Sequence, residues 1–342
     1  MRRGLMAWDP EEIPVAALTA RVLRLQDAMQ AAGLDAFLLY TNFIRPGAVS
    51  YLTAFSPYWA DGVLLVPVRG EPLFATTLSK RVGSWIQTVK PVGDLVNSPA
   101  PGTVLGKRMA ESGARRVAIL ELDAFPAGLF DDIAAALPGV AIVAGSDVFA
   151  SARAHLDDVE RRLLNRADAI ARDALANLSA SAATNAGHAV GEVEKHARLA
   201  GAEEVYVAIA PDLDADRRFV RLSGPKPLGA RFAIRATVAY KGTWIRRIRT
   251  YSRNDGDGPA VRRAEAWFSQ LLEEIDLSRT PQDQIVASVA TLSGARLINW
   301  LAEAPVGTHP LTAISTAAPA LILTLGLDIG GIPWCGAGLV LL

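Results

Sequence analysis

Cysteine is nearly absent from the sequence, which holds Cys335 as its single thiol among 342 residues. One cysteine excludes an intramolecular disulfide and a zinc site built from cysteines, and it is typical of a reducing compartment. No apolar run approaches the roughly 20 residues of a membrane span. The opening MRRGLMAWDPEEIP reaches acidic residues and prolines without the apolar core of a signal peptide. We therefore expect a cytoplasmic protein with no membrane partner.

Net charge is absent as well, because 35 Lys and Arg balance 35 Asp and Glu. A neutral chain offers no overall attraction for nucleic acid or an anionic membrane, so no nucleic-acid partner is expected and any charge-driven role must be local. The phosphate-binding patterns GxGxxG and the P-loop, zinc-finger spacings and the GxSxG nucleophile pattern are missing too. What the chain does have is 51% hydrophobic residues, enough for the packed cores of two ordinary domains.

The first 150 residues alternate helical and strand-like patterns. Residues 15–32 place apolar side chains at helical spacing and end at Gly33, and short apolar runs with the character of buried strands follow. The alternation predicts an α/β domain over residues 1–150 around a mainly parallel sheet. The predicted strands are DAFLLYT, YLTAF, GVLLVPV, ARRVAILEL and GVAIVAG, with a helix at FDDIAAAL between the last two.

Residues 151–342 show helices first and an antiparallel-looking sheet afterwards, which predicts an α+β domain. The domain opens on the longest amphipathic pattern in the chain, at residues 156–182. Further helices are predicted at GEVEKHARLA, VRRAEAWFSQLLEEI and TPQDQIVASVATLSGARLINWLA, and strands at EVYVAIA, RFAIRATVAYKGTW, ALILTLGLD and AGLVLL.

The order of four segments is informative: RLQDAMQAAGLDAFLLYTN, HLDDVERRLLNRADAIARDAL, YKGTWIRRIRTYS and LILTLGLD…GAGLVLL. In this order they resemble the creatinase, prolidase and aminopeptidase P family. The first is similar to the opening helix and LDA strand, and the second to the linker helix. The third is similar to the strand pair written Y-x-G-Y-x-x-D-x-x-R-T, and the fourth to the closing strands. The resemblance implies a creatinase-like α/β domain followed by an α+β pita-bread domain.

The resemblance also implies a dinuclear metal site of two Asp, one His and two Glu, whose oxygens suit hard divalent cations. Laid on the strand-pair motif, Arg246 stands at the second Asp, and the family spacing puts Arg235 at the first. The closing strands put Gly326 and Gly336, to within one residue, at the two Glu positions, and His309 is the candidate for the ligand His. A lone His cannot hold a metal pair. We therefore predict a family member with no metal or cofactor that is not a working peptidase.

Creatinase itself hydrolyses a C–N bond without metal, using a His as general acid and base. The stretch DADRRFVRLSGPKPLG resembles that region and places Arg218 near the His, but a guanidinium stays protonated and cannot act as a base. Two alternatives stay open. One is a metal-independent C–N hydrolase or lyase on a small amide or amidine-type compound, with Asp216 or Glu303 moving the proton. The other is an Xaa-Pro aminopeptidase-like metallohydrolase.

Arginines gather in two neighbouring segments that the implied fold would bring around one cavity. Because Arg suits bidentate binding of carboxylate or phosphate, we expect a small anionic ligand there. Strand alternation keeps Arg246 and Arg247 from facing one pocket, and pairing on the surface with nearby aspartates is the competing interpretation. The residues expected to bind the ligand are Arg218, Arg221, Arg235, Tyr240, Arg246 and His309.

An aromatic group at the edge of the first domain predicts either a dimer contact, a wall of the partner's site, or core packing. It comprises Tyr51, Phe55, Tyr58, Trp59 and Trp85. We expect a homodimer, or a heterodimer in which this chain is the inactive partner of an active family member.

Overall fold

The computed structural model describes residues 8–42, 44–45, 47–55, 60–90, 92–221, 224–254, 256–276, 278–305 and 320–341. The chain divides into two compact units, an amino-terminal unit that ends at Val159 and a carboxy-terminal unit that begins at Glu160. None of the helices in the described ranges is long and apolar enough to cross a membrane.

The amino-terminal unit is built on a six-stranded sheet in the order β4-β3-β2-β1-β5-β6. Strand β2 runs antiparallel to both of its neighbours, and the remaining pairs are parallel, so the predicted mainly parallel α/β sheet is confirmed. The strands are β1 (Ala36–Thr41), β2 (Gly62–Pro67), β3 (Leu73–Thr76), β4 (Asp94–Asn97), β5 (Arg116–Ile119) and β6 (Ala141–Ala144).

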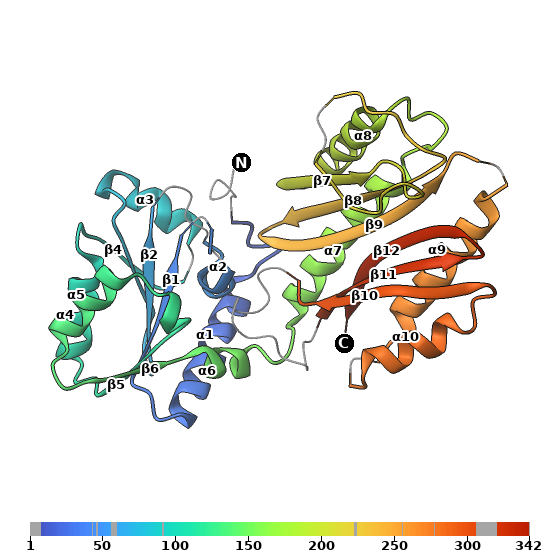
Figure 1. The fold of residues 1–342 in the computed structure, drawn as a ribbon. Coiled ribbons are helices and arrows are strands. Elements are labelled where there is room, and N and C mark those ends of the chain that lie inside the picture. The colour runs from blue at the N-terminus through green and yellow to red at the C-terminus, as the bar shows by residue number, and fades with distance from the viewer. Residues whose placement is uncertain are drawn as a thin grey trace. The chain divides into compact units, whose positions relative to one another are not determined.

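Helices surround this sheet (Figure 1). The first ends where Gly33 takes a positive φ of 64°, the left-handed conformation that glycine adopts without strain. The helices are α1 (Val15–Ala31), α2 (Gly47–Thr53), α3 (Lys80–Val89), α4 (Pro101–Glu111), α5 (Ala127–Ala136) and α6 (Ser146–Ala152), with one 3₁₀ turn at Leu122–Ala124.

The predicted strand at YLTAF is wrong, because this segment ends helix α2. The buried residues Val49, Leu52 and Thr53 are spaced three and four apart, which is helical spacing. A window that starts at Tyr51 misses the first of them. Short apolar runs cannot be assigned to helix or strand without such context.

The carboxy-terminal unit holds a second six-stranded sheet, in the order β10-β11-β12-β9-β8-β7, with antiparallel pairing throughout. Its strands are β7 (Glu204–Ala210), β8 (Arg231–Tyr240), β9 (Thr243–Ser252), β10 (Ala295–Glu303), β11 (Ala320–Ile329) and β12 (Ile332–Leu341). Its helices are α7 (Asp158–Ala176), α8 (Ala186–Leu199), α9 (Gly258–Glu274) and α10 (Pro281–Val289).

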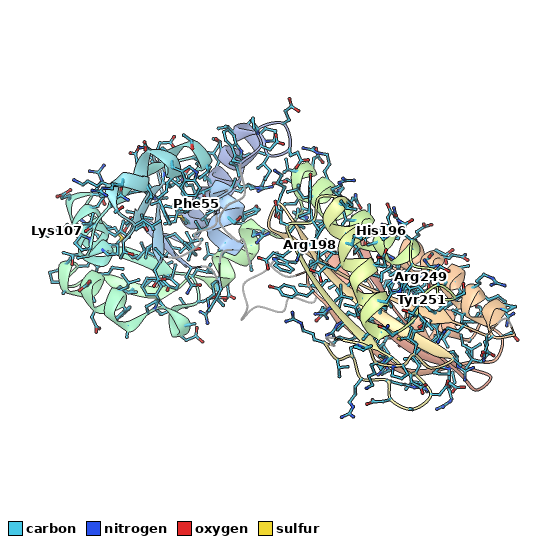
Figure 2. All side chains as sticks on the ribbon, turned by 90° about the horizontal axis from the view of Figure 1, so that it is seen from above. Phe55, Lys107, His196, Arg198, Arg249 and Tyr251 are labelled. Atoms are coloured by element: carbon cyan, nitrogen blue, oxygen red, sulfur yellow. The ribbon has the colours of Figure 1, made fainter. Side chains whose placement is uncertain are left out.

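One face of this sheet is covered by helices. Apolar residues of α7 and α8 pack on β7, β8 and β9, and those of α9 and α10 pack on β10, β11 and β12 (Figure 1). Tyr251, labelled in Figure 2, lies in the first of these cores and donates its hydroxyl hydrogen bond to Leu175 O at 2.6 Å. The opposite face carries only a small apolar cluster, which includes Ala233, Ile248 and Ala337.

The predicted helix from TPQDQ to INWLA is half wrong, because α10 stops at Val289 and the chain continues into strand β10. Beyond the end of this helix, Gly294 has a φ of 74°, which is not a helical value, and the following residues pair with β11. Since β10 is the edge strand and exposes Trp300 and Leu301 on alternate faces, its apolar residues show no period of two. The sequence pattern therefore does not distinguish this strand from a continuation of the helix.

Candidate functional site

A cavity of about 260 Å³ lies on the helix-free face of the carboxy-terminal sheet. Strands β8 to β12 line it together with the segment that follows β7. Its wall is mostly apolar, with Leu213, Phe219 and Ile248 among the contributors. Ligand sites usually measure about 300–1,000 Å³, so this cavity suits a small molecule.

Arg235 and Arg246 both reach the cavity because of the register between β8 and β9. Arg246 is opposite Thr237, and Arg235 is opposite Ile248. Directly paired residues share a face of the sheet, and residues two apart do as well. The two arginines therefore lie on one face and both line the cavity. Arg247 lies on the other face, where Asp168 of α7 accepts two hydrogen bonds of 2.6 Å from it.

Arg246 is paired on one side only. Its Nη1 contacts the carboxylate of Glu303, on the edge strand β10. Its Nε is buried and has no hydrogen-bond partner in the part of the chain that the structure describes. A buried donor left unpaired costs about 1–3 kcal/mol. The site thus holds a guanidinium with one donor still available.

Arg235 has no carboxylate partner and no hydrogen-bond partner among the described residues. It is half-buried, and its guanidinium carbon stands 5.3 Å from the ring centre of Phe219. Burial lowers the pKa of Arg235, the neighbouring Arg246 lowers it further, and Glu303 raises it. These shifts leave a guanidinium charged at neutral pH, so the cavity contains a cation that the fold does not neutralise.

The closing strands bring Gly326 and Cys335, rather than Gly336, to the cavity. Gly326 pairs with Cys335 across the hairpin, and both line the site. A Cβ on Gly336 would meet the rings of Trp334 and Phe268, on the helix-covered face. The resemblance places the second Glu position at Gly336 to within one residue, and within that margin Cys335 is the residue that lines the cavity.

The space beside Gly326 is already filled. The carboxamide oxygen of Asn299 occupies the place where a Cβ on Gly326 would stand. Burial raises the pKa of the Cys335 thiol to about 11, so the thiol is protonated at neutral pH. Thr250 joins β9 to β12 at this point, accepting from Cys335 N at 2.9 Å and donating to Cys335 O at 2.8 Å.

Divalent metal does not fit these donors. The positions that the resemblance assigns to four of five ligands hold two guanidiniums, a glycine and a protonated thiol. Hard cations need oxygen ligands, and a guanidinium offers donors only. Within the described ranges no group of three His, Cys, Asp or Glu is placed to hold a metal ion.

Three of the residues expected to bind the ligand do not line the cavity. The Arg218 side chain is 86% exposed and pairs with Asp216, two residues away, at 2.8 Å. Arg221 stands over the ring of Tyr206 at 5.5 Å, and Tyr240 lies under Arg166 at 5.7 Å. For Arg218 the reason is local, because its guanidinium pairs with the carboxylate of Asp216 and does not extend to the sheet. His309 lies outside the described residues.

Sequence reasoning missed Thr324 and Asn299. Thr324 lines the cavity, and its hydroxyl is buried with no hydrogen-bond partner among the described residues. A lone polar residue within the apolar run ALILTLGLD, two before Gly326, was an available signal, since residues two apart share a strand face. The sequence offers no such signal for Asn299, because the pattern of its segment predicts a helix, and a helix would not place Asn299 beside Gly326.

Two aromatic residues of the predicted dimer contact belong to the core of the amino-terminal unit. Tyr51 is buried and carries the guanidinium of Arg153 at 3.9 Å over its ring. Phe55, labelled in Figure 2, is buried against Phe74 at 5.5 Å. These contacts are the packing alternative. Tyr58 and Trp59 lie outside the described residues, and the dimer stays a prediction.

Residues 21–155 match the family model of the Creatinase/Prolidase N-terminal domain. The match covers the amino-terminal unit almost completely. That unit belongs to the creatinase/prolidase amino-terminal domain family. No match to a curated protein was found.

Solved structures extend the likeness to the whole chain. The Xaa-Pro dipeptidase of Bacillus anthracis is 17% identical, with a TM-score of 0.67 over 94% of this chain and 93% of that one. The X-Pro aminopeptidase of Thermotoga maritima MSB8 is 15% identical, with a TM-score of 0.68 over 93% and 94%. The prolidase of Pyrococcus horikoshii OT3 is 15% identical, with a TM-score of 0.67 over 94% and 92%. At such identities the likeness shows the fold, a creatinase-like domain followed by a pita-bread domain.

Proposed function

We propose that the carboxy-terminal cavity binds a small carboxylate without metal, and that the chain is a family member that does not cleave peptides. The observation that carries this is the half-buried Arg235, which has no hydrogen-bonding partner among the described residues and faces a cavity. A desolvated cation is costly unless an anion pairs with it. A bound carboxylate supplies that anion.

The neighbouring groups suit the same ligand. Arg246 keeps a free Nε donor beside Arg235, and Thr324 offers an unpaired hydroxyl. A carboxylate has two oxygens and about four lone-pair positions, so it can accept from more than one of these groups. The apolar wall accommodates the rest of a small molecule. A charge-assisted hydrogen bond of this kind contributes roughly 1.5–3 kcal/mol.

The peptidase reading has less support because the donors at the implied metal positions do not suit a metal. The C–N hydrolase reading needs a general acid. Asp216 is held ionised, since its hydrogen bonds with Arg218 lower its pKa to about 2, and it does not line the cavity. Glu303 is engaged by Arg246. Neither carboxyl is thus suited to protonate a leaving nitrogen at neutral pH.

Calorimetry and thermal unfolding test the binding. Acetate, propionate and butyrate, added as sodium salts, should raise the melting temperature of the purified chain above that in equal sodium chloride. Arg235→Gln should remove the increase. Arg253→Gln is the matched control, because Arg253 is exposed and its side chain donates a long hydrogen bond of 3.4 Å to Leu228 O. Equal responses to carboxylate and chloride in the wild-type chain would refute the proposal.

Metal analysis tests the other half. After dialysis against a metal-free buffer, we expect far less than one equivalent of Mn, Zn, Co or Fe per chain, and no change in melting temperature with a chelator. About two equivalents that survive dialysis, with stability lost on chelation, would restore the metallopeptidase reading.

A further inference from the structure

The positive charges around the cavity exceed the negative charges paired with them by one. Arg217, Arg235 and Arg246 line the cavity. Arg217 has Asp328 at 4.0 Å, and Arg246 has Glu303. Arg235 alone is left without a carboxylate among the described residues. The site therefore carries one unbalanced positive charge.

We propose that the cavity selects a monocarboxylate with a short apolar body over a dicarboxylate, and that Glu303 is the residue that sets this selectivity. The inference rests on the proposed function, since it names the ligand class of that same site. Glu303 acts by occupying Arg246, which would otherwise offer a second cation to a second carboxylate.

The position of Glu303 supports this role. It lies on the edge strand β10, opposite Ile322 of β11, on the same strand face as Leu301. Leu301 lines the cavity, and the side chain of Glu303 remains about one-third exposed. Its charge is also coupled to the free cation, because Glu303 raises the pKa of Arg235 while Arg246 lowers it. The three groups form one electrostatic unit.

The lining between the charges is apolar, which penalises a second ligand charge. Phe219 lies against Arg235, and Leu213, Ile248 and Ile298 complete the walls. A carboxylate placed among such groups loses hydration without gaining a partner. A methyl or ethyl group in the same place gains from leaving water. Butyrate should therefore bind better than succinate, which has the same number of carbons.

The experiment compares dissociation constants for butyrate and succinate at pH 7.5 and constant ionic strength. Wild type should prefer butyrate. Glu303→Gln frees Arg246 and should shift the butyrate-to-succinate ratio toward succinate by about tenfold, the effect of one charge at roughly 10 Å near a protein surface.

Asp328→Asn provides a second route that leaves the Arg246 pair intact. It raises the net charge at the rim, and its amide oxygen can still accept from Gly331 N as Asp328 does at 2.9 Å. It should move the ratio toward succinate by less than Glu303→Gln. This variant decides the matter if Glu303→Gln does not fold.

The outcomes separate the two proposals. If wild type binds neither acid better than it binds chloride, the proposed function fails. If wild type binds butyrate but the ratio stays unchanged in Glu303→Gln, or in Asp328→Asn should the former not fold, the binding site stands and the charge-selection inference is overturned.

Discussion

The two faces of the β8–β9 strand pair treat arginine in opposite ways. On the helix-covered face, Arg247 donates two hydrogen bonds to Asp168, a residue of the fold itself. On the cavity face, Arg235 has no such carboxylate among the described residues. Both side chains come from one hairpin, and both are largely withdrawn from water. The contrast separates an arginine that stabilises the fold from one left for a ligand.

The largest expected effect comes from removing the carboxylate that pairs with Arg247 on the helix-covered face. Asp168→Asn leaves the Arg247 charge without its counter-ion, although the two side chains are only 10% and 17% exposed. Removing one partner of a buried pair costs about 3–5 kcal/mol, and because both side chains keep some contact with water we expect the lower end, about 3 kcal/mol. Urea unfolding measures this change. A loss below 1 kcal/mol would mean that the pair is screened like a surface contact.

The next effect concerns the half-satisfied arginine. Arg246→Ala should abolish the rise in melting temperature produced by carboxylates, a loss of roughly 1.5–3 kcal/mol of binding free energy. Arg253→Ala should leave that rise intact, because Arg253 lies in the exposed segment after β9. Thermal scans with and without butyrate measure both. Equal rises in melting temperature in the two variants would show that Arg246 does not bind the carboxylate.

A smaller effect tests an exception on the helix-covered side, Glu265 of α9. Its Oε2 is buried without a hydrogen-bond partner within the described ranges. Burial raises the pKa of Glu265, although Arg249 and Arg247 lower it. A raised carboxyl pKa means stability that is present below the unfolded-state pKa and is lost as pH rises through the folded-state pKa. Glu265→Gln should therefore stabilise the chain at pH 7.5 by about 1 kcal/mol, and by much less at pH 4.5. Melting curves at the two pH values check this; a gain of equal size at both would contradict it.

The smallest effect concerns the unsatisfied arginine without ligand. Arg235→Gln removes a desolvated charge and breaks no ion pair or hydrogen bond among the described residues. Its unfolding free energy in ligand-free buffer should equal that of wild type or exceed it by less than about 1 kcal/mol. Chemical denaturation measures this. A clear loss of stability would show that Arg235 supports the fold, and the comparison between the two faces would collapse.

Most of the fold followed from local patterns. The helix that ends at Gly33 and the buried strand after it are strong signals, because a left-handed glycine and a short aliphatic run each have few alternatives. Two elements were predicted wrongly, each for a physical reason. Helix α2 is too short to display its period from Tyr51 onward, and β10 is an edge strand without a clean alternation.

The site was only partly accessible to sequence reasoning. Strand alternation sufficed to put Arg235 and Arg246 on one face, since both lie on regular paired strands. It could not place Arg218, whose segment is irregular and whose partner is the adjacent Asp216. It could not find Asn299 either, because a position next to Gly326 is reached only across the β10–β11 pairing.

The packing of Asn299 against Gly326 would hinder the construction of a metal site in this cavity. Introducing Glu at 326 alone would drive its Cβ into the Asn299 carboxamide. An engineer would first have to shrink residue 299, and would gain nothing from that change until a carboxylate followed. Even then two guanidiniums would face the incoming cation. A metal centre here would therefore need coordinated changes at 299, at 326 and at the two arginines, because no single one of them creates a set of oxygen ligands.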